Sequence, residues 1–227
     1  MKKERNYKLL LAGIATVIVF ILWTVAISIV DIQAIGPKGS SVGFATVNRF
    51  VHNLTGVHME LYNITDWLGL IPLCFILEFA LLGLVQLIKR KSLLKVDTDI
   101  LVLGGFYIVV MAVYLFFEFY AVNYRPVLID GYLEASYPSS TTLLVMCVIP
   151  TAAMQLNSRI KNHKFSKAVT YILVAFTVFM VIGRLISGVH WITDIIGGAI
   201  LSTGLVIIYC SVVLLYRHTN NIFQSVL

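Results

Sequence analysis

Long runs of apolar residues, separated by short polar segments, dominate the chain. The runs cover about residues 9–30, 67–88, 99–122, 141–157, 168–188 and 191–216. A membrane-spanning helix needs roughly 20 apolar residues, and these runs are continuous, whereas a half-buried strand alternates apolar and polar residues. Only helices and closed barrels satisfy the backbone within lipid. The pattern therefore predicts an all-α polytopic membrane protein with six transmembrane helices.

The composition agrees with this prediction. Hydrophobic residues make up 59% of the 227 residues, charged residues make up 12%, and the mean hydropathy is +0.91. A soluble domain carries about 25% charged residues, so an ordinary soluble domain, a disordered chain and a coiled coil are excluded. No repeat or low-complexity linker divides the chain, and we expect residues 1–227 to form a single transmembrane domain. The first run is longer than the apolar core of a signal peptide, which is about 7–15 residues, so we expect it to be a retained span.

The distribution of basic residues predicts the orientation in the membrane. Four lysines and arginines precede the first span, four lie between spans two and three, four lie between spans four and five, and Arg217 follows span six. Thirteen of the 17 thus lie on one side, which the positive-inside rule makes cytoplasmic. We expect a multi-pass protein of the cell membrane with both termini in the cytoplasm. The net charge of +6 then reflects topology, and no nucleic-acid partner is indicated.

Two arginines and a helix start form a candidate phosphate site at the predicted outer ends of spans three to six. Ionisable groups that border spans are costly, which makes them functional candidates. The guanidinium groups of Arg125 and Arg184 suit phosphate oxygens. Ser139, Ser140 and Thr141 open the fourth span, where free backbone N–H groups attract an anion. Each feature alone has an ordinary explanation as a headgroup contact or a helix cap, but together they predict phosphate binding.

A histidine and an aspartate stand beside this candidate site. His190 and Asp194 are four residues apart at the predicted start of span six, so we expect them to share one helical face. A carboxylate that holds one imidazole nitrogen leaves the other nitrogen as a nucleophile or base. The pair is therefore the candidate catalytic group, and an ordinary helix cap is the alternative.

Two further features lie outside this cluster. The first outer loop, about residues 31–66, contains the mixed apolar and polar segment Val42–Leu54, which predicts an amphipathic interfacial helix. Glu78 lies near the middle of span two, as in some transporters. A single acid without a cationic partner or a pair of broken helices gives that class little support.

These residues resemble the type 2 phosphatidic acid phosphatase (PAP2) superfamily of integral membrane lipid phosphatases. The signature of that family reads Lys-x6-Arg-Pro, then Pro-Ser-Gly-His, then Ser-Arg-x5-His-x3-Asp. The matching residues are Arg125-Pro126 in the first part, Pro138-Ser139 in the second, and Arg184, His190 and Asp194, with full spacing, in the third. The resemblance implies a PAP2-like helical bundle with motifs on outer loops three and five, and neither a metal nor a cofactor.

The resemblance also assigns roles to these residues. It implies that His190 attacks phosphorus and becomes phosphohistidine, and that Asp194 orients it. It implies that Arg125, Arg184 and Ser139 hold the phosphate oxygens. In the family, the histidine of the second motif protonates the leaving group.

The sequence departs from the signature at three positions. Glu118 stands seven residues before Arg125, where the family has lysine, and Gly183 replaces a serine. Thr141 stands where the family has the general-acid histidine. A general acid typically contributes 10²–10⁴-fold in rate, so its loss impairs the expulsion of a poor leaving group.

Two functions fit these departures. The first is a lipid phosphatase that hydrolyses a lipid phosphate or a prenyl diphosphate at the outer face. A prenyl diphosphate releases a lipid monophosphate, whose second pKa of about 6 makes it a good leaving group without an acid. Glu118, or His52 or His58 of the first loop, is a candidate substitute acid. The alternative is a catalytically impaired protein that binds lipid phosphates as a sensor, carrier or assembly subunit.

Overall fold

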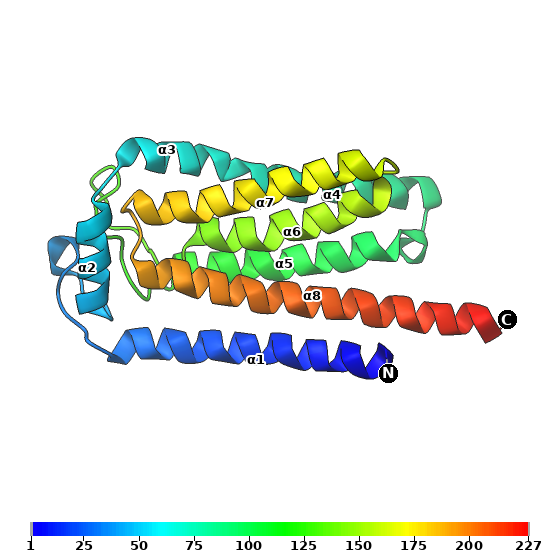
Figure 1. Ribbon diagram of the computed structural model, residues 1–227, viewed down its shortest axis with the longest axis horizontal. Helices are drawn as coiled ribbons and strands as arrows, with labels where there is room; N and C mark the ends of the chain where they lie inside the picture. The colour runs from blue at the N-terminus through cyan, green and yellow to red at the C-terminus, as the bar shows by residue number, and fades with distance from the viewer. Residues whose placement is uncertain (1, 227) are drawn as a thin grey trace.

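The fold, seen in a computed structural model, is a bundle of long helices, and the structure describes residues 2–226 (Figure 1). The α-helices within that range are α1 (Lys2–Ile29), α2 (Ala45–Thr55), α3 (Met59–Leu68), α4 (Leu70–Arg90), α5 (Thr98–Phe119), α6 (Ser140–Arg159), α7 (His163–Ile186) and α8 (Ile192–Val226). Two short 3-10 helices, Pro37–Gly39 and Leu93–Lys95, lie in the connections. Six helical segments of the described chain are long and apolar enough to cross a membrane, which confirms the predicted all-α polytopic architecture.

The second spanning segment starts earlier than the apolar run at 67–88 predicts. It runs from Met59 to Arg90 as α3 followed directly by α4, with Gly69 between the two helices. Polar residues such as Asn63 and Asp66 interrupt the apolar pattern of α3, so the sequence alone assigns this stretch to the first outer loop. The difference matters because α3 packs against α7 and brings side chains to the functional site.

The ends of the bundle differ in what they carry. Both termini and the α4–α5 and α6–α7 connections lie at one end, while α2 runs across the opposite end (Figure 1). The end with the termini is the one where the basic residues cluster. Helix α6 is central: 67% of its apolar window is buried, against 11–39% for the other spans, and it contacts α4, α5, α7 and α8. Its N-terminus is therefore held firmly at the end that α2 covers.

Helix α2 confirms the predicted amphipathic helix at Val42–Leu54. Its apolar residues Val47, Phe50 and Leu54 are exposed, whereas Asn48 is buried. The Asn48 side chain donates to Thr193 Oγ1 at 3.0 Å, and its Oδ1 accepts from the backbone N–H of Thr193 at 3.3 Å. These bonds fix α2 against the first turn of α8. The exposed apolar face suits the membrane surface.

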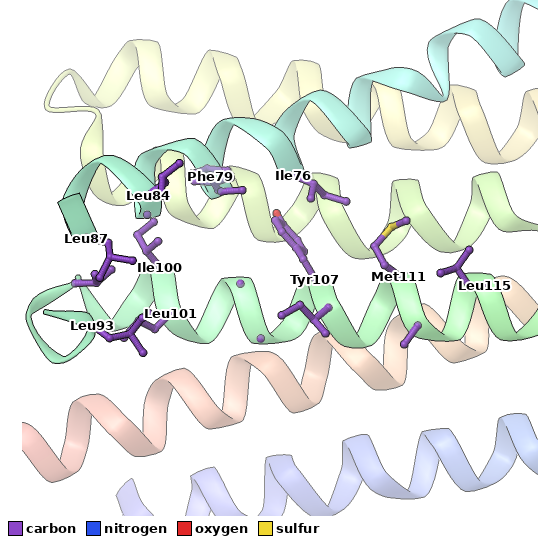
Figure 2. A pocket seen from close by; sticks show the side chains of 17 residues that line it. Ile76, Phe79, Leu84, Leu87, Leu93, Ile100, Leu101, Tyr107, Met111 and Leu115 are labelled. Atoms are coloured by element: carbon purple, nitrogen blue, oxygen red, sulfur yellow. The ribbon is translucent and has the colours of Figure 1, made fainter. Parts of the chain in front are cut away.

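A long apolar groove of about 660 Å³ lies between α4 and α5 (Figure 2). Near the end with the termini it is lined by Leu87 and Leu93, and it extends to Met111 and Leu115 toward the other end. Leu115 precedes Glu118 by three residues, so the two side chains lie on the same face of α5. The groove thus ends one helical turn from the polar end of the bundle.

Candidate functional site

A short β-like hairpin in the segment between α5 and α6 positions four polar side chains. Asp130 and Gly131 form its two-residue turn with φ of 49° and 84°, the positive values that a type I′ turn requires and that an Asp-Gly pair favours. In the two arms, Asn123 O accepts from the N–H of Ser136 at 2.8 Å, and the N–H of Arg125 donates to Glu134 O at 3.0 Å. Residues two apart on an extended arm face the same way. Asn123, Arg125, Glu134 and Ser136 therefore share one face.

The turn between α7 and α8 carries His190 and is fixed by a close backbone contact. Gly188 has a φ of 67°, and a Cβ added to it would lie 1.9 Å from Gly56 O. Only glycine fits there, since a side chain would be strained and would collide with the α2–α3 connection. The N–H of His58 donates to Ser187 O at 2.9 Å and ties the same two segments together.

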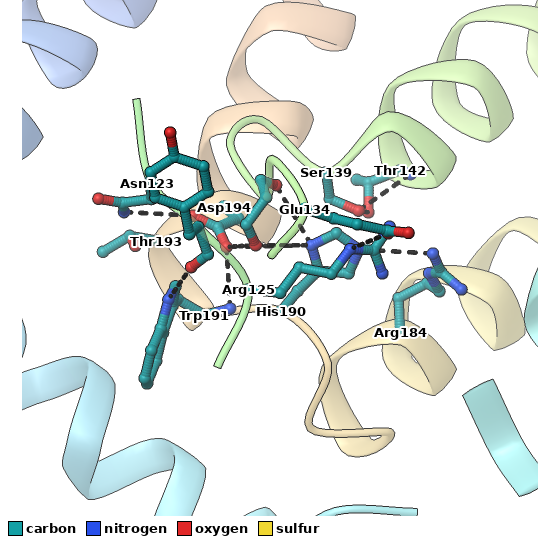
Figure 3. Close-up of polar contacts among 12 residues, drawn as sticks. Asn123, Arg125, Glu134, Ser139, Thr142, Arg184, His190, Trp191, Thr193 and Asp194 are labelled. Atoms are coloured by element: carbon teal, nitrogen blue, oxygen red, sulfur yellow. Dashed lines mark hydrogen bonds and ion pairs between the residues drawn. The ribbon is translucent and has the colours of Figure 1, made fainter. Parts of the chain in front are cut away.

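His190 is buried, and its contacts determine which nitrogen carries the proton. Nδ1 lies 3.2 Å from Ser136 O and 3.1 Å from Ser136 Oγ, and Nε2 lies 3.4 Å from Arg184 Nη2 (Figure 3). A carbonyl oxygen only accepts and a guanidinium only donates, so Nδ1 carries the proton and Nε2 keeps its lone pair. Burial, followed by the charges of Arg125 and Arg184, lowers the pKa of His190 well below 6.5. The imidazole is thus neutral, with its nucleophilic nitrogen facing an arginine.

Asp194 is fully buried at the start of α8. Its Oδ2 accepts from the N–H of Trp191 at 2.9 Å and from Ser136 Oγ at 2.5 Å, and Asn123 Nδ2 lies 3.5 Å from Oδ1. The bond to Trp191, the residue before α8, caps the helix. The same oxygen lies 3.9 Å from His190 Nδ1, which is too long for a hydrogen bond.

The expectation of one shared helical face for His190 and Asp194 is therefore wrong in its geometry. His190 precedes α8, which begins at Ile192, so the histidine lies in the turn. The first turn of the helix brings the carboxylate back toward the imidazole, and Ser136 lies between the two groups. The pair is close in space, but the contact is indirect.

Arg184 and Arg125 both lie near the Tyr62 ring. The guanidinium carbons are 4.9 Å and 5.6 Å from the ring centroid, respectively, which is within cation–π range. Arg184 is 1% exposed, and its Nη1 lies 3.4 Å from Asp66 Oδ1 and 3.5 Å from Thr65 Oγ1. Helix α3 thus supplies an aromatic support and an acidic partner for the arginines.

Arg125 is 7% exposed and forms an ion pair with Glu134, with 3.1 Å between Nε and Oε2. The alignment of this pair is not that of a hydrogen bond, and Arg125 Nε and Nη1 and Arg184 Nε have no hydrogen-bond partner within residues 2–226. Buried guanidinium donors without partners are costly, and an anion between the two arginines would satisfy them. The geometry therefore suits a phosphate.

The N-terminus of α6 lies beside this cluster. The backbone N–H of Ser139 donates to Asp194 O at 3.1 Å, which joins the starts of α6 and α8. Ser139 Oγ caps α6 by accepting from the N–H of Thr142 at 3.4 Å and from its hydroxyl at 3.0 Å (Figure 3). The amides of Ser140 and Thr141 are the next donors at this helix end and remain available to an anion.

The comparisons with known proteins bear on this site. Residues 104–218, slightly more than half of the chain, match the family described as the PAP2 superfamily. The chain belongs to the PAP2 superfamily. The matched residues include Arg125, Ser139, Arg184, His190 and Asp194, as the motif resemblance implies.

A solved structure supports the same PAP2 fold. The chain is similar to the crystal structure of a transmembrane PAP2-type phosphatidylglycerolphosphate phosphatase from Bacillus subtilis, with a TM-score of 0.54 and 19% sequence identity. The similarity covers 88% of this chain and 93% of the other. No curated protein sequence matches the chain.

The candidate substitute acids of this PAP2 protein lie on α5 (Glu118), on α2 (His52) and in the α2–α3 connection (His58). Glu118 lines a small cavity together with Ser136 and Ser140. The His52 ring packs against Trp191 with centroids 5.5 Å apart, and burial lowers its pKa. His58 is exposed and contacts Thr55 O at 2.8 Å. The carboxylates that contact the arginines are instead those of Asp66 and Glu134.

Sequence reasoning missed five residues of this site, namely Tyr62, Asp66, Asn123, Glu134 and Ser136. The apolar pattern leaves Tyr62 and Asp66 in the first outer loop, because polar residues mask the start of α3. The Asp-Gly pair at 130–131 is a hairpin signal that could have placed Glu134 and Ser136 opposite Arg125 and Asn123. Glu78 is exposed on α4, 12 residues after Asp66.

Proposed function

We propose that this PAP2 protein is a membrane lipid phosphatase that hydrolyses a lipid phosphate or a prenyl diphosphate through a phosphohistidine on His190. The observation that carries the proposal is the placement of Nε2. Its lone pair faces Arg184, and Arg184 and Arg125 are both buried and carry guanidinium donors that find no hydrogen-bond partner among the described residues. A neutral nucleophile beside an anion clamp is what phosphoryl transfer to nitrogen requires.

The chemistry follows from these positions. The Nε2 lone pair attacks phosphorus, the bond from phosphorus to the leaving oxygen breaks, and Nδ1 keeps its proton. Arg125 and Arg184 hold the oxygens that gain charge in the transition state, with the amides of Ser140 and Thr141 as further donors. Water then attacks the phosphohistidine, inorganic phosphate leaves, and Nε2 recovers its lone pair.

The leaving group favours a diphosphate over a monoester. Thr141 is buried, and its hydroxyl is no practical acid at neutral pH. An alkoxide leaves poorly without a proton, whereas a lipid monophosphate leaves readily because its second pKa is about 6. Prenyl diphosphate is therefore the preferred substrate class of this proposal.

The apolar groove between α4 and α5 supports a lipid as the source of the phosphate. It runs along the bundle and ends at Leu115, one turn from Glu118 and the small cavity that Ser136 lines. A hydrocarbon chain in the groove would direct a headgroup toward the arginines. The positive-inside rule predicts that this end of the bundle lies at the outer face, with both termini in the cytoplasm.

The alternative function is lipid-phosphate binding without turnover. It is favoured by Thr141 and by the two carboxylates that already pair with the arginines, Asp66 with Arg184 and Glu134 with Arg125. Such a protein would be a sensor, a carrier or an assembly subunit.

One experiment separates the two functions. Purified protein in detergent is incubated with a prenyl diphosphate or with phosphatidic acid, and released phosphate is measured. We expect release from the diphosphate by wild type and none by His190→Ala, while both proteins bind phosphate through the arginines. Binding without release by wild type would refute the phosphatase and support the alternative.

A further inference from the structure

The hydroxyl group of Ser136 occupies a position that the proposed chemistry leaves unassigned. Ser136 is 2% exposed and lies between the two catalytic candidates, with Oγ 3.1 Å from His190 Nδ1 and 2.5 Å from Asp194 Oδ2. The direct separation between Nδ1 and Oδ2 is 3.9 Å. Among the residues that the structure describes, Ser136 is the one whose hydrogen bonds join this carboxylate to the imidazole.

The donors and acceptors fit one arrangement. Nδ1 carries a proton, because it faces the carbonyl oxygen of Ser136, which only accepts, while Nε2 faces Arg184, which only donates. The Ser136 hydroxyl donates to Asp194 Oδ2, which also accepts from the N–H of Trp191. The lone pairs of the hydroxyl remain free to accept from Nδ1–H. The chain of bonds thus runs from His190 through Ser136 to Asp194.

We propose that Ser136 is the positioning residue that couples Asp194 to His190. This inference rests on the proposed phosphatase function. When Nε2 bonds to phosphorus, the imidazole becomes cationic, and the negative charge of Asp194 stabilises it across the polarised hydroxyl. The serine thereby takes the place that a direct carboxylate–imidazole bond holds in other nucleophile–base systems.

The backbone carbonyl and the hydroxyl of Ser136 have separable tasks. The carbonyl is retained in every substitution at this position and continues to favour the proton on Nδ1. The hydroxyl is lost in Ser136→Ala, so that variant removes the link to Asp194 and leaves the tautomer favoured. We therefore expect a slower chemical step with nearly unchanged substrate binding.

The test is a double-mutant cycle on the full-length protein. Ser136→Ala, Asp194→Asn and the double variant are compared with wild type for the single-turnover rate of phosphohistidine formation, for KM with a prenyl diphosphate, and for orthovanadate affinity. We expect Ser136→Ala to lower the rate about 10- to 100-fold, with KM changed less than threefold. The double variant should be no slower than the slower single variant, because both changes interrupt the same link.

Two further variants separate positioning from a structural role. Ser202 is a buried serine on α8 whose hydroxyl donates to Gly198 O at 2.7 Å, away from the site. Ser202→Ala should leave the rate unchanged, and Ser136→Thr, which keeps a hydroxyl, should be faster than Ser136→Ala. A wild-type rate in Ser136→Ala, or losses that multiply in the double variant, would overturn the inference.

Failure of the proposed function gives a different result. If wild type releases no phosphate, vanadate affinity becomes the readout, because vanadate bonds to the same Nε2. A loss of tenfold or more in Ser136→Ala, with no further loss on adding Asp194→Asn, supports the role of Ser136 in a binding protein. Unchanged vanadate affinity, or no vanadate binding by wild type, overturns it.

Discussion

Arg184 Nη2 lies 3.4 Å from His190 Nε2, so the guanidinium donates toward the lone pair that would attack phosphorus. This contact holds the imidazole ring in place. In a complex, the phosphate would enter between the two groups and take over the donors of Arg184. Under the proposed function, the same arginine would orient the nucleophile before binding and neutralise the substrate afterwards.

This relationship predicts the effect of removing either arginine. A charge-assisted hydrogen bond contributes about 1.5–3 kcal/mol, so Arg184→Ala or Arg125→Ala should weaken orthovanadate binding roughly ten- to a hundredfold. Isothermal titration with the purified variants measures this change. Arg49→Ala is the matched control, because Arg49 is exposed on α2 and contacts Gln33. Wild-type affinity in both site variants would contradict the clamp.

The neutral state of His190 predicts how stability depends on pH. Its pKa in the folded protein is well below 6.5, so the unfolded chain binds more protons as pH falls below that value. When the pH is lowered from 7.5 to 5.5, this group alone therefore decreases the free energy of unfolding by about 1 kcal/mol. The Tm should fall by a few degrees as a result.

Two variants identify the group responsible. His190→Gln should show a smaller decrease in Tm between these two pH values than wild type, measured by thermal unfolding in detergent. His58→Gln, which changes an exposed histidine, should behave like wild type. His52 remains in both variants, and the lowering of its pKa by burial contributes equally to each. If Tm fell equally in His190→Gln and His58→Gln, folding would not lower the pKa of His190.

Restoring the missing acid should change substrate preference. Thr141→His places an imidazole at the family position for leaving-group protonation, which is worth typically 10²–10⁴-fold where the proton is needed. We expect faster phosphate release from phosphatidic acid and little change with a prenyl diphosphate, because only the alkoxide needs the proton. Thr141→Ala removes the hydroxyl without adding an acid and should show no such gain. Equal acceleration of both substrates would argue against a role in protonation.

Cysteine labelling tests the orientation. In a background with Cys74, Cys147 and Cys210 replaced, Tyr132→Cys near the hairpin turn should react with an impermeant thiol reagent added to intact cells. Lys161→Cys, in the α6–α7 connection, should react only after the membrane is opened. Both positions are exposed, so access through the membrane decides the result. Labelling of Lys161→Cys alone from outside would place the site in the cytoplasm.

The sequence predicts the spans and the main site residues because both depend on local patterns. Continuous apolar runs determine the helices. Arg184, His190 and Asp194 lie close together in the sequence, at the end of α7, in the α7–α8 connection and at the start of α8. Tyr62 and Asp66 were missed because polar residues mask the start of α3, which only tertiary packing against α7 reveals. The Ser136 bridge was missed because Ser136 precedes His190 by 54 positions and Asp194 by 58 positions along the chain.

The hairpin at 120–138 presents its polar side chains to the site in only one pairing register of its two arms. Asn123 and Arg125 on one arm, and Glu134 and Ser136 on the other, face the site only while Tyr124 pairs with Ala135. Shifting one arm by a single residue would turn its polar groups to the opposite face. An insertion or deletion in the Asp130–Gly131 turn would therefore displace a clamp arginine or the Ser136 bridge without touching the histidine. The length of this loop is as much a part of the site as any side chain in it.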